Sequence, residues 1–357
     1  ISRTARGKLV TIKAAIRFWS SWSYRMEDGP VNAQTLVVTF DLGGAERAVV
    51  AEALGGSIDA VYLPDLAEPE RDAALRRATI VLSHNTGKEL RQGEHALLAR
   101  AKLIQFLTAG VDFIPLHELP PGVPVASNGG AYAEPMAEHA LAMTLAAAKR
   151  LLVEHAALQR GAFHQFTMNR MLAGRTCGIL GFGGIGAATA RLMRAVGMRV
   201  HAINRSGRAE AQLDWIGTPD RLDELLAAAD VLVISLPLTR TTQGMIGAPQ
   251  LDRMKRDAIL VNLARGEIID EGALYAHLRA NPDFTACIDA WWIEPVRHGT
   301  FRLDHPFLEL PNVIGSPHNS GSVPESRGTG LRRALANCRR VLRGEAPLHL
   351  VAEDDRL

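Results

Sequence analysis

Three side chains in the last third of the sequence have the types needed to act together on a small acid. Arg265 lies in the segment VNLARGEIID, Glu294 in IDAWWIEP and His318 in SPHNSG. An arginine fork binds a carboxylate at two points and polarises a neighbouring carbonyl, and a histidine transfers a proton near neutral pH. Glu294 would accept a hydrogen bond from the other ring nitrogen of His318 and favour the protonated imidazole. We therefore predict Arg265, Glu294 and His318 as catalytic residues that hold a 2-oxo acid and protonate its carbonyl oxygen during hydride transfer. Taken singly, each has a structural alternative, as part of a turn, of a loop or as a packed histidine.

These residues follow apolar runs that alternate with helix-length segments, a pattern typical of parallel sheets built from βαβ units. Arg265 lies just beyond the fourth run of its set, and His318 follows the last. Open α/β sheets bind ligands at the carboxyl ends of their strands. Six strands of a doubly wound sheet are predicted, at 176–180, 198–203, 230–235, 258–263, 284–289 and 312–316.

A glycine-rich turn follows the first of these strands. Residues 181–186 read GFGGIG, with a helix predicted over 185–195 and the next strand directly after it. In this context the glycines permit a tight turn, close approach of a pyrophosphate and close packing of helix on strand, and the helix N-terminus presents free N–H groups to phosphates. The pattern predicts a dinucleotide site that includes Gly181, Phe182, Gly183, Gly184, Ile185 and Gly186.

The end of the second strand favours NADP(H) over NAD(H). NAD-binding sites usually place Asp or Glu there to bind the ribose hydroxyls. This chain instead has Asn204, followed by Arg205, Ser206, Gly207 and Arg208. Arg205 and Arg208 could pair with a 2′-phosphate and Ser206 could donate a hydrogen bond to it, although two solvated surface arginines remain the alternative.

An earlier set of apolar runs predicts a second α/β region. The runs cover 35–40, 59–63, 79–83, 102–107 and 123–126, with helices predicted over 45–55 and 88–101. One long helix is predicted over 132–160, long enough to bridge two domains, and a last amphipathic helix over about 325–343. At 357 residues the chain favours two domains.

Composition excludes several classes of function. Residues 1–25 hold six basic and no acidic side chains, so the remainder has 34 basic and 38 acidic residues, a net charge of −4. Nucleic-acid binding is therefore disfavoured. No apolar run reaches the roughly 18 residues of a membrane span. We interpret residues 1–30 as an extension that is disordered or not native to the protein, with a transit peptide as the alternative.

The cysteines and histidines predict neither a disulfide frame nor a metal site. Cys177, Cys287 and Cys338 are widely spaced and odd in number, which favours reduced thiols in a cytoplasmic protein. The twelve histidines form no ligand-spaced cluster with cysteine or carboxylate.

Taken together, these segments resemble the D-isomer-specific 2-hydroxyacid dehydrogenase family, in particular its glyoxylate and hydroxypyruvate reductases. The resemblance runs from about residue 78 to 346. It is carried by TAGVDFIPL (108–116), NGGAYAEPMAEHA (128–140), GILGFGGIG (178–186), SLPLTRTTQGMI (235–246), VNLARGEIID (261–270), Asp289…Glu294-Pro295 and Pro317-His318.

The resemblance implies two Rossmann-like domains, with a nucleotide domain (132–320) inserted into a flavodoxin-like substrate domain (33–131 plus 321–346), and a homodimer. It also implies that Thr86 and Gly87, in SHNTGKEL, bind the substrate carboxylate together with Arg265 and His318. The residues that match the family's cofactor wall are Leu236, Pro237, Thr242, Leu263, Ala264 and Asp289.

Two alternatives remain at this stage. The same fold serves dinucleotide-sensing corepressors, and the arginine site would also suit a dehydrogenase of a small anion such as phosphite. Formate is disfavoured because formate dehydrogenases of this family carry Gln where Glu294 stands. The role of the Trp291–Trp292 pair, in the pocket or in packing a strand end, stays open.

Overall fold

Strand residues alternate between two buried faces, which is why both sheets carry helices on each side. In the computed structural model, which describes residues 34–56 and 58–355, β9 (Val231–Ile234) directs Val231 and Val233 into one apolar core and Leu232 and Ile234 into another. Strands that are apolar on both faces are typical of parallel sheets covered by helices. The predicted α/β class with parallel sheets is confirmed.

The first sheet has five parallel strands within residues 34–126, in the order β2-β1-β3-β4-β5. This is the order of flavodoxin-like sheets, as predicted. The strands are β1 (Thr35–Val38), β2 (Asp59–Tyr62), β3 (Ile80–Ser83), β4 (Leu103–Phe106) and β5 (Val125–Ala126).

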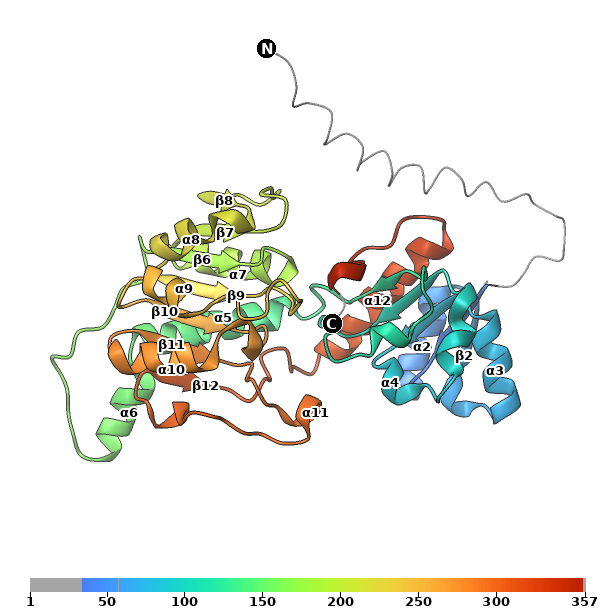
Figure 1. Cartoon of the computed structure of the whole chain (residues 1–357), viewed down its shortest axis with the longest axis horizontal. Helices are drawn as coiled ribbons and strands as arrows, with labels where there is room; N and C mark the ends of the chain where they lie inside the picture. Colours follow the sequence, from blue (N-terminus) through green and yellow to red (C-terminus); the bar gives the residue numbers. More distant parts are fainter. Residues whose placement is uncertain (1–33, 57, 356–357) are drawn as a thin grey trace, which may run out of the picture. The chain divides into compact units, whose positions relative to one another are not determined.

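Helices from distant parts of the sequence cover this sheet. Helix α3 (Glu68–Arg77) packs on one face. Helices α2 (Gly44–Leu54) and α12 (Ser326–Leu342) pack side by side on the other, as Figure 1 shows. The apolar stripe of α12 includes Leu331 and Leu335, both buried in the first sheet's core. The chain therefore returns to the first sheet after completing the second, as predicted.

The second sheet has seven strands in the described part of the chain, in the order β12-β11-β10-β9-β6-β7-β8. The prediction of six strands missed β8, whose three residues are too few to stand out as an apolar run. Besides β9, the strands are β6 (Thr176–Leu180), β7 (Arg199–Ile203), β8 (Trp215–Gly217), β10 (Ile259–Asn262), β11 (Thr285–Ile288) and β12 (Val313–Gly315).

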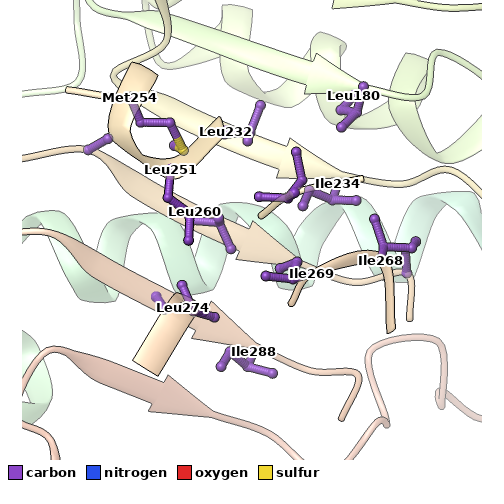
Figure 2. Packing of buried hydrophobic residues seen from close by; sticks show 14 of the residues in the cluster. Leu180, Leu232, Ile234, Leu251, Met254, Leu260, Ile268, Ile269, Leu274 and Ile288 are labelled. Atoms are coloured by element: carbon purple, nitrogen blue, oxygen red, sulfur yellow. The ribbon is translucent and has the colours of Figure 1, made fainter. Parts of the chain in front are cut away.

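The second sheet is doubly wound. Its two faces are covered by α5 (Ala133–Ala148) with α7 (Gly184–Ala195), and by α8 (Leu222–Ala228) with α9 (Ala248–Arg253) and α10 (Glu271–Ala280). Figure 2 shows the second of these cores, where side chains of β9, β10 and β11 meet those of α9 and α10. These rigid layers fix the loops that follow each strand.

The remaining elements are short. They are α4 (Thr86–Glu89), α6 (Leu151–Gln159), α11 (Pro295–His298) and the 3₁₀ turns η1 (Leu63–Asp65), η2 (Glu94–Arg100), η3 (Leu116–Glu118), η4 (Pro219–Arg221), η5 (Gly266–Ile268), η6 (Phe307–Glu309) and η7 (Glu353–Asp355).

Two predicted helices are interrupted. The helix expected over 88–101 is instead α4 followed by η2, because Gly93 between them adopts a left-handed φ of 87°. The helix expected over 132–160 is divided into α5 and α6 at Arg150, whose φ is 53°. Periodicity alone did not predict either break, since the residues on both sides favour helix.

The predicted extension, residues 1–30, lies outside the described residues. Among the helices of the described part of the chain, none is long and apolar enough to cross a membrane.

Candidate active site

Loops from both sheets border one cavity of about 1660 Å³. The loop after β4 contributes residues 108–113, and the turn after β6 contributes residues 181–185. The loops after β10, β11 and β12 contribute Arg265, Glu294 and His318. Each of these segments follows the carboxyl end of a strand, where open α/β sheets bind ligands. The three candidate catalytic residues therefore line one cavity with the glycine-rich turn.

The loop that carries His318 is held in place by a buried carboxylate. Asp289, fully buried after β11, accepts hydrogen bonds from Ser316 Oγ at 2.5 Å and from the backbone N–H groups of Asn319 and Ser320, each at 3.2 Å. His318 itself has a φ of 51°. A non-glycine residue in this region carries about 1–3 kcal/mol of strain, and such strain is concentrated at functional sites.

Glu294 forms a close pair with His318. The two carboxylate oxygens lie 2.8 and 2.7 Å from His318 Nδ1, and the backbone N–H of Trp291 donates to Oε1 at 2.6 Å. Burial raises the pKa of Glu294, but the hydrogen bond and charge of His318 and the charge of Arg265 outweigh it, so its pKa lies below the usual value. An ionised carboxylate only accepts, so Nδ1 carries the proton and Nε2 is the nitrogen left for a substrate.

The segment that carries Arg265 is shaped by a buried asparagine at the end of β10. The Asn262 side chain accepts from the backbone N–H of Ala264 at 3.0 Å and donates to the Arg265 carbonyl at 2.9 Å. The Arg265 guanidinium reaches the loop of the first sheet, where its Nε lies 3.1 Å from both carboxylate oxygens of Asp112. Arg265 thus connects the loops of the two sheets within the cavity.

The glycine-rich turn has the shape that a dinucleotide requires. Gly181 has a φ of 100°, and a Cβ there would lie 2.7 Å from the backbone nitrogen of Leu236. Gly183 has open space where a side chain would be, and it precedes α7 without a side-chain cap. The first N–H groups of α7 are therefore available to an anion. Gly186 is buried, and a Cβ there would collide with the Gly181 carbonyl oxygen.

The turn after β7 differs from the predicted phosphate site in one respect. Asn204 and Arg205 line the cavity, whereas Ser206 and Arg208 do not. The Asn204 side chain instead closes the turn, accepting from the N–H groups of Ser206 at 3.1 Å and Gly207 at 2.8 Å. Of the three side chains predicted to contact a 2′-phosphate, Arg205, Ser206 and Arg208, only Arg205 lines the cavity.

A carboxylate that sequence reasoning missed lies beside Arg205. Asp355 Oδ2 is 2.5 Å from Arg205 Nη2, and Asp355 also lines the cavity. Its segment reaches this place because residue 350 pairs with the edge of β5 at Ala126. A carboxylate from a distant segment therefore stands beside this turn, although the turn's own sequence, residues 204–208, contains none. Asp355 is 150 positions from Arg205, and local sequence gave no signal of the contact.

The residues of the predicted cofactor wall divide into those that line the cavity and one, Asp289, that does not. Five of its members line the cavity, namely Leu236, Pro237, Thr242, Leu263 and Ala264, as do Phe182, Gly184 and Ile185 of the turn. Asp289 does not line the cavity, because its carboxylate is fully buried under the His318 loop. Its expected contact with a cofactor stays a prediction.

Thr86 and Gly87 are not brought together with the other predicted site residues. Neither borders the cavity, and Thr86 is fully buried at the start of α4. The loop 108–113 does border the cavity, and its Gly110 lies so close to Arg265 that a Cβ there would collide with Nη2. The available signal was that this loop also directly follows a strand, β4, and belongs to the TAGVDFIPL motif.

The two tryptophans have different places. Trp291 lines the cavity and donates from Nε1 to the Ser316 carbonyl at 2.8 Å. Trp292 donates to the Ile269 carbonyl at 2.7 Å and stacks on Phe307. Both are buried at the end of β11, and of the two only Trp291 borders the cavity.

A glycine-rich turn before a helix, together with an arginine and a histidine–carboxylate pair in the same cavity, is typical of nicotinamide-dependent dehydrogenases. Residues 141–320 match the model of the D-isomer specific 2-hydroxyacid dehydrogenase, NAD binding domain. The chain is also 33% identical over 261 residues to a glyoxylate reductase of Korarchaeum cryptofilum, covering 71% of this chain and 77% of the relative. The chain belongs to the D-isomer specific 2-hydroxyacid dehydrogenase family.

Solved structures agree with this assignment. A putative formate dehydrogenase from Pyrobaculum aerophilum superposes with a TM-score of 0.75 at 27% identity, covering 91% of this chain and 100% of that one. A D-isomer specific 2-hydroxyacid dehydrogenase from Xanthobacter autotrophicus, in complex with NADPH and MES, gives 0.72 at 27% identity and covers 90% and 98%. The protein is an oxidoreductase that transfers a hydride between a nicotinamide cofactor and a 2-oxo acid. These relatives favour an enzyme over a cofactor sensor or a phosphite dehydrogenase.

Proposed function

We propose that this enzyme reduces glyoxylate, hydroxypyruvate or a similarly small 2-oxo acid, with Arg265, Glu294 and His318 as its catalytic residues. The observation that carries the proposal is the presence of these three side chains in one cavity with the glycine-rich turn. The glyoxylate reductase name of the relative from Korarchaeum cryptofilum supports the substrate. No other function is favoured by a specific feature of the cavity.

Each residue has a distinct task in this proposal. The Arg265 guanidinium binds the substrate carboxylate and polarises the adjacent carbonyl. His318, protonated at both ring nitrogens, donates its Nε2 proton to the carbonyl oxygen as negative charge develops there. Glu294 keeps the Nδ1 proton in place and stabilises the imidazolium. A bound nicotinamide cofactor supplies the hydride.

The loop 108–113 takes over the role expected of Thr86 and Gly87. It lies at the carboxyl end of β4, lines the cavity, and contacts Arg265 through Asp112. We assign the substrate carboxylate to the part of the cavity that both the Arg265 guanidinium and this loop border, because Gly110 lets the guanidinium pack against the loop backbone there. Ala109 and Gly110 are then the backbone partners of the substrate.

The lining of the cavity supports a dinucleotide that extends from the turn after β6 to Arg265 and His318. Residues 181–185 would hold the pyrophosphate, and Leu236, Pro237, Leu263 and Ala264 would flank the rings. Arg205 supports a preference for NADP(H), since its exposed guanidinium would pair with a 2′-phosphate in place of Asp355. NADPH in the related Xanthobacter enzyme is consistent with this preference.

We also propose the domain division 33–131 plus 321–346 for the substrate domain and 132–320 for the nucleotide domain. Support comes from α5, which begins at Ala133 and packs on the second sheet, and from α12, which packs on the first.

A homodimer is the assembly that we propose. Helix α6 exposes Leu151, Leu152 and Leu158, each more than half exposed, and the segment after it exposes Phe163, Phe166, Met168 and Met171. Monomeric proteins rarely expose so many neighbouring large apolar side chains, and a second copy of the chain would cover them. Light scattering should report twice the chain mass, and the F163S/F166S variant should be shifted toward the monomer. A monomeric wild-type protein would contradict the proposal.

The function is tested by a panel of 2-oxo acids assayed with NADPH and NADH in parallel. Glyoxylate and hydroxypyruvate should be reduced, with a higher kcat/KM for NADPH than for NADH. Oxidation of neither cofactor by any member of the panel, despite cofactor binding, would refute the proposed function.

A further inference from the structure

A buried carboxylate of the first sheet occupies one edge of the Arg265 guanidinium. The Asp112 side chain is only 2% exposed, and its Oδ1 lies 3.0 Å from Arg265 Nη2 in addition to the contacts with Nε. Arg265 Nη1 also donates to the Ala264 carbonyl at 2.8 Å. These contacts fix the direction of the guanidinium and engage one N–H of each terminal nitrogen, so the second N–H of Nη1 and of Nη2 is the part left for a substrate carboxylate.

A second arginine shares this carboxylate. Arg297, in α11, has its Nη2 3.6 Å from Asp112 Oδ2 and its Nη1 2.7 Å from Glu267 Oε1. The Arg297 side chain is 15% exposed and lines the cavity. A chain of alternating charges therefore joins α11, η5 and the loop after β4. In order, it consists of Arg265, Asp112, Arg297 and Glu267.

The arrangement has a consequence for the charge that a substrate meets. The four side chains carry no net charge together, but without Arg297 they would carry one negative charge in excess. Burial weakens solvent screening of such an excess, so it would repel an incoming carboxylate. Arg297 does not create a second anion-binding site, because the carboxylates of Glu267 and Asp112 already offset its charge.

We infer that Asp112 and Arg297 are positioning residues for substrate binding. Asp112 aims the Arg265 guanidinium at the substrate carboxylate, and Arg297 offsets the charge of Asp112 so that Arg265 keeps its attraction for the substrate. This inference rests on the proposed role of Arg265 in the reduction of a 2-oxo acid, and it adds to that role two residues of the cavity wall.

The test compares R297Q with the double variant E267Q/R297Q, in which the cluster again has no net charge. Two measurements are made: steady-state kinetics with glyoxylate and NADPH, and binding of oxamate, a monoanionic carboxylate, to the enzyme–NADPH complex. R297Q should raise KM and the oxamate Kd by about 10-fold, with a smaller change in kcat. The double variant and R297K should recover most of both values, to within about threefold of wild type.

A matched control removes an arginine of the same segment outside the cavity. Arg302 is 64% exposed and pairs only with Asp304 among the salt bridges of the described residues, so R302Q should change KM and the oxamate Kd less than twofold. NADPH affinity should be unchanged in all of these variants.

The outcomes separate this inference from the proposed function. An R297Q enzyme whose KM and oxamate Kd stay within twofold of wild type would overturn the inference and leave the proposed function intact. An equal loss in R297Q and E267Q/R297Q would also overturn it, since packing rather than charge would then be responsible. A wild-type enzyme that reduces no 2-oxo acid but binds oxamate, with the R297Q effect on Kd, would refute only the proposed function. Absence of both turnover and oxamate binding would contradict both.

Discussion

The loops of the two sheets contribute different kinds of groups to the same cavity. The second sheet supplies the side chains that carry charge and protons, Arg265, Glu294 and His318. The first sheet supplies a loop whose contribution is backbone space at Gly110 and one buried carboxylate, Asp112. Proton transfer needs a titratable side chain in a fixed geometry, whereas a substrate can be positioned by shape alone. Changes in the two regions should therefore alter different kinetic constants.

The contacts that hold His318 in the second sheet's loop differ in kind from those around Gly110 in the first sheet's loop. His318 is held in a left-handed backbone conformation by Asp289 beneath its loop. At Gly110 the requirement is instead the absence of a side chain, because a Cβ there would collide with Arg265 Nη2. Substitutions around His318, in the loops of the second sheet, should therefore mainly affect proton transfer. Substitutions that add volume at Gly110, in the loop of the first sheet, should mainly affect substrate binding.

The largest effect is expected at the proton donor of the second sheet. His318→Ala should lower kcat for glyoxylate reduction by about 10²–10⁴-fold, the usual contribution of general acid–base catalysis. NADPH affinity should be retained, because the turn 181–185 is untouched. His305→Ala serves as a control, since His305 stacks on Tyr275 away from the cavity wall. Near-normal turnover in His318→Ala would contradict the assignment of proton transfer to the second sheet.

A volume change in the first-sheet loop should mainly affect substrate binding. A Cβ at Gly110 collides with Arg265 Nη2, so Gly110→Ala should raise KM for glyoxylate by at least about 10-fold, with a smaller loss of kcat. Gly44→Ala is the matched control, because a Cβ there meets no atom within 4 Å. If Gly110→Ala lowers kcat alone and leaves KM unchanged, the proposed division between the regions is wrong.

The turn after β7 offers a test of the cofactor preference. Arg205→Ala should weaken NADPH binding by about 10-fold, as expected for loss of a hydrogen bond to a charged group, and leave NADH binding unchanged. Arg208→Ala, outside the cavity, should change neither by more than about twofold. Asp355→Asn should strengthen NADPH binding a few-fold by freeing Arg205. Equal NADPH affinity in Arg205→Ala and wild type, from titration of cofactor fluorescence, would exclude the preference.

The smallest effect concerns stability and its dependence on pH. Glu294 has a lowered pKa in the folded protein, since contact with His318 outweighs burial. Its contribution is therefore present above the ordinary value of 4.5 and is lost as the pH falls through the lower folded value. Glu294→Gln should cost about 1–2 kcal/mol in urea unfolding at pH 7, and the difference should shrink toward acid pH. A difference that stays constant between these conditions would argue against the ionised pair.

The sequence predicted the parts of this fold that depend on neighbouring residues. Strands such as β6 and β10 were predicted because continuous apolar runs are suited to a sheet buried on both faces. The glycine-rich turn was predicted because Gly181 needs a conformation that other residues avoid. The breaks at Gly93 and Arg150 were missed, since a single residue in a left-handed conformation leaves helical periodicity unchanged.

Sequence by itself determined the class of fold, the positions of most strands along the chain and the three side chains suited to the chemistry, because these depend on local pattern and on which residue follows which strand. Only the tertiary structure decided that Asp112 meets Arg265 and that Asp355 meets Arg205, contacts between residues 153 and 150 positions apart. It also decided that residues 108–113, and not Thr86 and Gly87, border the cavity. The physical reason is that strand order and helix packing bring these segments together, and neither spacing nor composition records which loops will face one another.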